Sequence, residues 1–183
     1  MKNQGIYYSE STPIFCVGET VDKAMYIAEG FITRSGLNPL GDPRIVSILE
    51  ANEIKAGPDF IDHSPSEYVI EATPGTYVVY IKYEQLKRVC EKFPETREFW
   101  SKIISANHRQ ELRLKKLFAL KGIDLVEAFY KRYPKMLKPN IGLTNEKIAS
   151  YLNMGVSTLI EHKTKLIELG KLPHPTELNK TAC

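Results

Sequence analysis

The stretch from Leu143 to Gly170 constrains the fold of this chain more than any other. Thr144 can cap a helix, because its hydroxyl can accept a hydrogen bond from a backbone N–H two or three residues on. The segment Asn153-Met154-Gly155 breaks the helical pattern, since Asn and Gly tolerate the left-handed backbone that ends a helix. Apolar residues at helical spacing then resume and run to Gly170. A short helix, a turn of about three residues and a second helix form the helix-turn-helix pattern.

Spacing alone leaves two interpretations of this stretch, a DNA-binding element or two packed helices of an ordinary helical domain. The charge distribution favours the first. Residues 1–101 hold 10 Lys and Arg against 15 Asp and Glu, whereas residues 102–183 hold 15 against 7. A basic half that carries a helix-turn-helix favours a polyanionic partner held largely by phosphate contacts. A solvated basic surface with no such partner has the same composition and stays an alternative.

Short apolar segments separated by Gly and Pro fill the first 82 residues and predict a small antiparallel barrel or sandwich. We expect residues 1–13 to be an irregular lead-in and residues 50–66 to be a long loop. Thr73-Pro74-Gly75-Thr76 has the Pro and Gly that a type II turn requires. The segments on either side of this turn, Tyr68–Ala72 and Thr76–Lys82, are therefore expected to pair as a hairpin.

The hydrophobic period becomes helical at Tyr83, which predicts helices at Tyr83–Lys92, Glu95–Leu120 and Ile123–Tyr133. The second of these has no internal Pro or Gly, and its apolar stripe is longer than a helix packed on a small barrel needs. We therefore favour a helix that also packs on a partner helix in a dimer, with a purely intramolecular helix as the alternative. The predicted dimerisation residues are Trp100, Ile103, Ile104, Asn107, Leu114, Leu117 and Phe118.

No sequence feature indicates a metal, a cofactor, a membrane or an enzyme. Cys16, Cys90 and Cys183 are widely spaced, which is typical of reduced thiols in a cytoplasm and unlike a metal site. No apolar run is long enough to cross a bilayer, and no signal peptide is recognisable. The common hydrolase, nucleotide-binding and zinc-protease motifs are missing. A catalytic triad assembled from distant residues leaves no local motif and stays an alternative.

The order of the expected elements resembles the Crp/Fnr family of bacterial transcription regulators. The segments that carry the resemblance are IFCVGETVDKAMYIAEGFIT, DPRIVSILEANEIKAGPDF, YEQLKRVCEKFPETREFWSKIISANHRQELRLKKL and LTNEKIASYLNMGVSTLIEHKTKL, and together they span roughly residues 12–172. The family's leading helix and first strand have no counterpart before Pro13, so the roll is expected to be short at its N-terminus. The tail after Gly170 leaves little room for a full wing hairpin.

The resemblance implies an α+β fold in three parts. These are an antiparallel β-roll of the cyclic-nucleotide-binding type over residues 1–94, a dimerisation helix over 95–120 and a winged-helix-like helix-turn-helix domain over 121–183. It implies a transcription regulator that binds double-stranded DNA as a homodimer, with RNA polymerase as a further candidate partner. The alternative is a sensor or protein-interaction module on the same scaffold that does not bind DNA.

The cassette that binds the cyclic phosphate in nucleotide-binding members runs Gly-Glu, several residues, then Arg-Ser or Arg-Ala. The matching span here is Lys55–Ala72, where Pro58 follows Gly57 and Ser66-Glu67 stand near the place of the Arg. Pro58 has no N–H to donate, and Glu67 would repel a phosphate. We therefore expect no cyclic AMP binding, and the identity of any effector stays open.

Members that read guanines carry Arg and Glu near the start of the recognition helix and a second Arg one turn later. The matching positions here are Val156, Ser157 and Glu161. Val cannot form the bidentate pair that Arg makes with guanine, so the chain either reads a different sequence or binds DNA weakly. The residues implied as DNA contacts are Thr144, Asn145, Val156, Ser157, Thr158, Glu161, Lys163 and Lys165.

Overall fold

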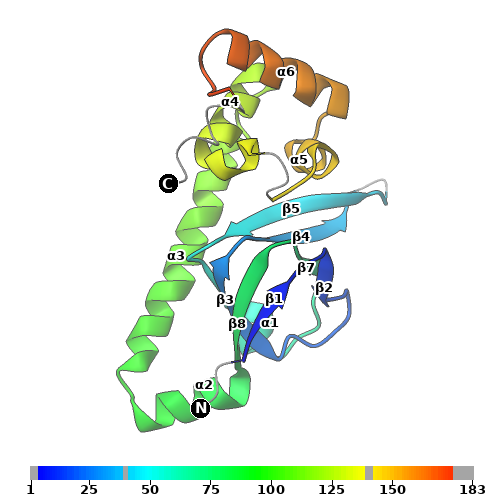
Figure 1. The fold of residues 1–183 in the computed structure, drawn as a ribbon. Coiled ribbons are helices and arrows are strands. Elements are labelled where there is room, and N and C mark those ends of the chain that lie inside the picture. The colour runs from blue at the N-terminus through cyan, green and yellow to red at the C-terminus, as the bar shows by residue number, and fades with distance from the viewer. Residues whose placement is uncertain (1–3, 39–40, 139–141, 175–183) are drawn as a thin grey trace. The chain divides into compact units, whose positions relative to one another are not determined.

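The computed structural model describes residues 4–38, 41–138 and 142–174 (Figure 1). The chain divides into two compact units, residues 1–111 and 112–183. The boundary falls within the long helix α3 (Thr96–Leu117), whose bounds lie inside the predicted helix Glu95–Leu120. Each unit has a core of its own and is described separately.

The first unit contains two four-stranded antiparallel sheets that share one core, as predicted from the short apolar segments. One sheet has the order β1 (Gln4–Tyr8), β8 (Thr76–Lys82), β3 (Lys23–Glu29) and β6 (Ile54–Lys55). The other has the order β2 (Thr12–Phe15), β7 (Val69–Ala72), β4 (Phe31–Leu37) and β5 (Pro43–Glu50). Both sheets contribute buried side chains to the core, among them Met25, Ile27, Val78, Phe15, Ile32 and Ile70.

The expectation of an irregular lead-in over residues 1–13 is wrong. Strand β1 lies in this region and pairs with β8, with Ile6 opposite Val78 and Tyr7 opposite Tyr77. Ile6 and Tyr7 are exposed, so the segment lacks the alternation of a half-buried strand. The expected long loop at residues 50–66 also contains β6 and the short helix α1 (Pro58–Ile61), which are too short to produce a hydrophobic period.

The predicted turn at Thr73–Thr76 forms, but the predicted hairpin does not. The Thr76 N–H donates to the Thr73 carbonyl (3.2 Å), and Gly75 has a φ of +80°. The strands on either side, β7 and β8, lie in different sheets. The Thr76 Oγ1 donates to the Phe31 carbonyl (2.9 Å) and accepts from the Phe31 N–H (3.1 Å). These two hydrogen bonds join the turn to the start of β4. The turn is therefore a corner between the sheets.

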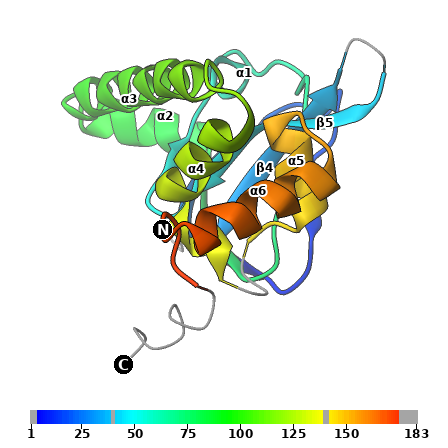
Figure 2. The same cartoon turned by 90° about the horizontal axis from the view of Figure 1, so that it is seen from above.

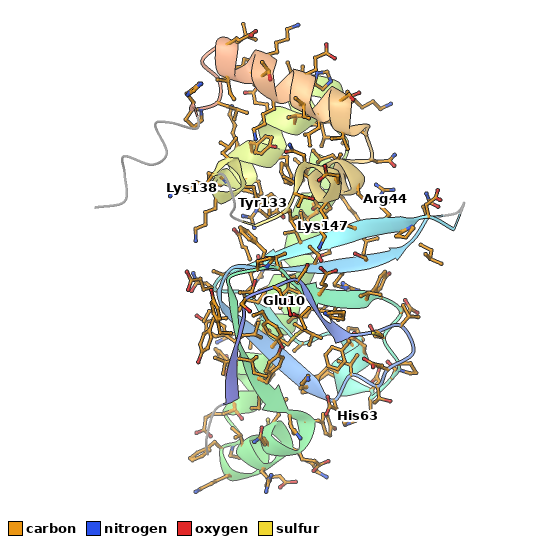
Figure 3. All side chains as sticks on the ribbon, turned by 45° about the vertical axis from the view of Figure 1, so that its right-hand side comes forward. Glu10, Arg44, His63, Tyr133, Lys138 and Lys147 are labelled. Carbon is orange, nitrogen blue, oxygen red and sulfur yellow. The ribbon has the colours of Figure 1, made fainter. Side chains whose placement is uncertain are left out.

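Helix α2 (Tyr83–Lys92) follows β8 and is joined to the α1 region by aromatic contacts. The Tyr83 ring lies edge-on to the rings of His63 (4.0 Å between centroids) and Phe60 (5.8 Å). His63 is labelled in Figure 3. At the start of α3, Trp100 packs against the core of the first unit. This end of the long helix therefore belongs to the first unit, as the sequence predicts.

The second unit is built from α4 (Gly122–Arg132), the 3-10 helix η1 (Pro134–Leu137), α5 (Asn145–Leu152) and α6 (Val156–Glu168). The Phe129 ring lies 5.2 Å, 5.1 Å and 5.9 Å between centroids from the rings of Tyr130, Tyr133 and Tyr151. Helix α6 packs against both α4 and α5 (Figure 2). No wing strand occurs between residues 112 and 174 where the structure describes them, and the rest of the predicted winged region lies outside the described residues.

Candidate functional site

Helix α5, the turn and α6 form where the capping residues predict. The Thr144 Oγ1 accepts a hydrogen bond from the Lys147 N–H (3.3 Å) at the start of α5. Asn153 ends the helix in the left-handed conformation (φ 55°, ψ 49°). Gly155, with extended backbone, then opens α6. Two short helices joined by the turn Asn153–Gly155 have the geometry of a helix-turn-helix.

The inner face of α6 carries a lysine as well as leucines. Leu159 and Leu166 are buried, and Lys163 lies on the same stripe, four residues after the first and three before the second. Its Nζ is 5.2 Å from the centroid of the Tyr130 ring on α4. Burial lowers the pKa of Lys163 and raises the pKa of Tyr130 to about 12. The structure thus turns Lys163 toward α4 and away from the exposed face of α6.

The outer face of α6 is polar and negative at its centre. Ser157, Glu161, Thr164 and Glu168 recur at helical spacing and are all exposed. Lys165 lies on one flank of this stripe, and the Ile160 side chain on the other is 46% exposed. The face therefore offers hydroxyls and carboxylates, with a single lysine beside them.

The predicted DNA contacts differ in exposure and in orientation. Thr144, Ser157, Thr158, Glu161 and Lys165 are exposed, Asn145 and Val156 are partly buried, and Lys163 faces inward. Thr144 and Asn145 lie at the N-terminal end of α5, and Val156, Ser157 and Thr158 form the first turn of α6. Helix N-termini carry unpaired N–H groups and a partial positive charge, which suits contacts to phosphate.

Two further lysines of this unit are held by a carboxylate. The Lys131 Nζ lies 2.6 Å from Glu127 Oε1, and the Lys171 Nζ lies 3.0 Å from Glu127 Oε2. Hydrogen bonds from these two lysines lower the pKa of Glu127, the one from Lys131 having the larger effect. The ion pair of Lys171 joins α4 to the segment that follows α6, whereas Lys131 and Glu127 both lie in α4. Part of the basic charge of this half therefore supports its own fold.

The predicted dimerisation residues occupy different environments along α3 and just beyond it. Trp100 is partly buried and Ile103 is buried, whereas Leu114 and Leu117 are partly exposed. Phe118, the residue after the helix, packs edge-on against Tyr151 of α5 (5.1 Å between centroids). The side chains of Ile104 and Asn107 lie outside the described ones. Leu112, which the sequence did not single out, is 45% exposed.

The cassette-like span borders a cavity of about 690 Å³ in the first unit. Pro58 begins α1, and Ser66, near the expected place of the Arg, is buried with its Oγ donating to the Tyr68 carbonyl (2.7 Å). Among the described residues, no group of three His, Cys, Asp or Glu side chains is arranged to hold a metal ion. The described helices include none that is long and apolar enough to span a membrane.

Comparison with known proteins gives matches at the level of structure. No family model matches the chain, and no curated protein does. FixK2 from Bradyrhizobium japonicum is similar over 100% of this chain and 98% of its own, with 16% identity and a TM-score of 0.70. The regulator CLP of Xanthomonas campestris is similar over 92% and 88%, with 13% identity and a TM-score of 0.65.

The Catabolite Activator Protein of Thermus thermophilus is similar over 92% of this chain and 80% of its own, with 18% identity and a TM-score of 0.52. The chain has the Crp/Fnr fold. The predicted α+β architecture of roll, long helix and helix-turn-helix is therefore confirmed. Identities this low concern the fold, and the function follows from the residues of this chain.

Two features of these sites were missed at the level of sequence. The inward position of Lys163 was open to prediction, because its spacing from Leu159 and Leu166 places it on the buried stripe. The cavity beside the cassette also takes Arg34 from β4 and Tyr68 from the loop before β7. No local pattern links these two positions, since they meet only when β4 pairs with β7.

Proposed function

We propose that this chain is a DNA-binding transcription regulator of the Crp/Fnr type that works as a homodimer and does not respond to cyclic AMP. The observation that carries this proposal is the geometry of α5, the turn and α6, in which α6 exposes a continuous polar face. The shared fold supports it, because CLP is described as a global regulator that responds to c-di-GMP. RNA polymerase is the further partner that such a regulator would contact.

The proposed DNA contacts follow from exposure and chemistry. The exposed hydroxyls of Thr144, Ser157 and Thr158 lie at helix N-termini and suit phosphate oxygens, as the partly buried Asn145 does. Lys165 adds a positive charge for a phosphate. Glu161 can accept a hydrogen bond from the N4 amino group of cytosine, and Val156 offers only apolar contact at the start of the helix. Lys163 would act indirectly, by holding α6 on α4.

A salt series of binding to random-sequence duplex DNA, followed by fluorescence anisotropy, tests this function. The binding constant should fall steeply with salt, by a log–log slope of about −0.9 for each phosphate neutralised. Lys165→Glu should weaken binding at every salt concentration. Lys87→Glu, an equal charge change at an exposed position of α2, should leave it unchanged. Absence of binding at low salt would refute the proposal.

A homodimer through α3 would place two copies of α6 on one DNA duplex, as helix-turn-helix dimers do. Trp100, Ile103, Leu114 and Leu117 recur at heptad spacing, the pattern of helices that pack together. Because Trp100 and Ile103 already pack within the chain, we propose that Leu114 and Leu117 carry most of the contact. Ile104, Asn107 and Phe118 complete the proposed interface.

The insensitivity to cyclic AMP is supported by the backbone beside the cavity. A cyclic phosphate needs a positive side chain together with free N–H donors. Here the N–H groups of Gly18 and Ser66 donate to Ser66 O and Glu19 O, and the Ser64 N–H donates to Asp59 O. Titration calorimetry with cyclic AMP should give no micromolar isotherm, and a clear isotherm would overturn this part of the proposal.

The negative centre of α6 favours one alternative, a protein-interaction module that does not bind DNA. Glu161 lies at the middle of the exposed stripe and Glu168 at its C-terminal end, and both would repel phosphates. Ile160 and Leu169, 46% and 59% exposed, add apolar area suited to a protein surface. The salt series decides between the two functions, because this alternative predicts no binding to DNA even at low salt.

A further inference from the structure

The cavity beside the cassette-like span is lined by charged groups of both signs. Arg34 comes from β4 and Lys55 from β6, whereas Asp59 lies in α1 and Glu67 in the loop before β7. Its volume, about 690 Å³, is in the range of pockets that hold small metabolites. Two cationic and two anionic side chains give the lining no net charge, which suits a ligand that is itself neutral overall but charged at both ends.

The guanidinium of Arg34 lies over the ring of Tyr68. Its carbon Cζ lies 4.3 Å from the centroid of the Tyr68 ring. Gly36 leaves room for the same ring, because a Cβ there would lie 3.1 Å from it, closer than an ordinary van der Waals contact. The pairing of β4 with β5 shifts register between Arg34 and Ser35, which face Ser47 and Ile45, so Val46 of β5 is the extra residue beside Arg34. A stacked guanidinium keeps its planar fork of donors, which matches the geometry of a carboxylate.

Among the described residues, Arg34 has no carboxylate partner, and its Nε–H has no acceptor. Lys55 and Asp59 differ from Arg34, because their charged ends lie close together beside Gly57. A Cβ added at Gly57 would be 3.1 Å from the Lys55 Nζ and 2.1 Å from the Asp59 Oδ1. These two charges therefore offset one another within the lining. Arg34 and Glu67 are left as the cation and the anion that a ligand could neutralise.

We propose that this cavity binds a small zwitterion of the amino-acid class, with its carboxylate on Arg34 and its ammonium on Glu67. A bidentate pair to Arg34 would satisfy two of the five N–H donors of its guanidinium. A purely anionic ligand would meet Glu67 unfavourably, and a purely cationic one would meet Arg34 unfavourably. The N–H groups of Gly18, Ser64 and Ser66 are already bonded within the chain, which disfavours a phosphate.

Titration calorimetry on the full chain tests the proposal, with the standard amino acids as probes and acetate, methylamine, inorganic phosphate and cyclic AMP for comparison. At least one amino acid should bind, whereas acetate and methylamine, each carrying one half of the zwitterion, should bind much more weakly. Binding by phosphate or by acetate as strong as by the best amino acid would overturn the proposal. So would the absence of binding by every amino acid at millimolar concentration.

Variants locate the site. Glu67→Gln and Arg34→Met should each weaken the binding of the amino acid about tenfold to a hundredfold, because each removes a charge-assisted hydrogen bond. Glu67 is exposed, so its substitution should not affect folding. Glu29→Gln removes an exposed carboxylate at the end of β3, outside the lining, and should change nothing. Unchanged affinity in Glu67→Gln would refute the assignment. These outcomes are independent of DNA binding, which the salt series measures separately.

Discussion

The ammonium of Lys163 lies over the aromatic ring of Tyr130, 5.2 Å from its centroid. This contact joins the middle of α6 to α4 and separates two lysines that are only two residues apart. Lys163 faces the core of its unit, whereas Lys165 is exposed on the outer face of α6. The two side chains should therefore serve different purposes, one in stability and the other in binding.

Substitution of these lysines by Met should separate the two effects. Lys163→Met should lower the free energy of unfolding by about 1 kcal/mol, the value of a partly desolvated cation–π contact, and leave the salt slope of DNA binding unchanged. Lys165→Met should leave stability unchanged and reduce that slope by about one. Chemical denaturation and anisotropy measure the two quantities. A reduced slope in Lys163→Met would contradict the inward orientation.

The helix-turn-helix was predictable from the sequence because its signals are local. Thr144 caps α5 and Asn153 ends it through interactions within a few residues, so pattern and structure agree there. The roll was less predictable, because its pairings join distant residues. Strand β1 pairs with β8, which lies about 70 residues later in the sequence, and no local feature of Gln4–Tyr8 predicts that partner.

The corner at Thr73–Thr76 illustrates the same limit. The type II turn is local and was predicted, but its use as a link between sheets depends on Thr76 binding Phe31 of β4. The cavity has the same origin, since Arg34 and Glu67 approach only when β4 and β7 pair. The cassette-like span alone predicts that a cyclic phosphate does not bind. The zwitterion proposed for the cavity follows only from the tertiary structure.

The corner predicts a large difference between two glycine substitutions. Gly30 has a φ of +82°, and a Cβ there would lie 2.6 Å from the Cα of Thr76, a backbone atom that cannot move aside. Gly30→Ala should therefore destabilise the first unit by more than about 2 kcal/mol. Gly75→Ala has a similar φ of +80° with no atom within 4 Å of the added Cβ, so it should cost only about 1 kcal/mol.

Thermal and chemical unfolding of both variants check this difference. Because the backbone strain is matched, the excess cost of Gly30→Ala measures the close approach of β4 to the corner. Equal destabilisation by the two substitutions would mean that Thr76 does not hold the start of β4 as described.

Glu127 predicts a pH-dependent contribution to the stability of the second unit. Lys131 and Lys171 lower its pKa from the ordinary value of 4.5, so the folded state releases this proton more readily than the unfolded state. The resulting stabilisation is fully present above pH 4.5 and is lost as the pH falls through the lowered pKa. Wild type should therefore be more stable than Glu127→Gln at neutral pH, and the difference should disappear in acid.

Unfolding midpoints measured across this pH range in low salt test the prediction, because salt screens an exposed ion pair. Glu168→Gln, which removes an exposed carboxylate at the end of α6, provides the matched control and should show no such pH dependence. A constant difference between wild type and Glu127→Gln down to the most acid pH would contradict the role of the two lysines.

The proposed dimer can be tested with two leucines of α3. Leu114 lies on the heptad stripe with Ile103 and Leu117, whereas Leu112 lies about 200° around the helix from Leu114. An aspartate at position 114 would place a charge in the apolar contact between two α3 helices, where it would have no partner.

Leu114→Asp should therefore sediment as a monomer, and Leu112→Asp should remain a dimer. Because both variants replace Leu by Asp in one helix, a general loss of helix stability would affect them alike. Dissociation of Leu112→Asp alone would assign the interface to another face of α3, and a Leu114→Asp protein that stays dimeric would refute the proposed contact.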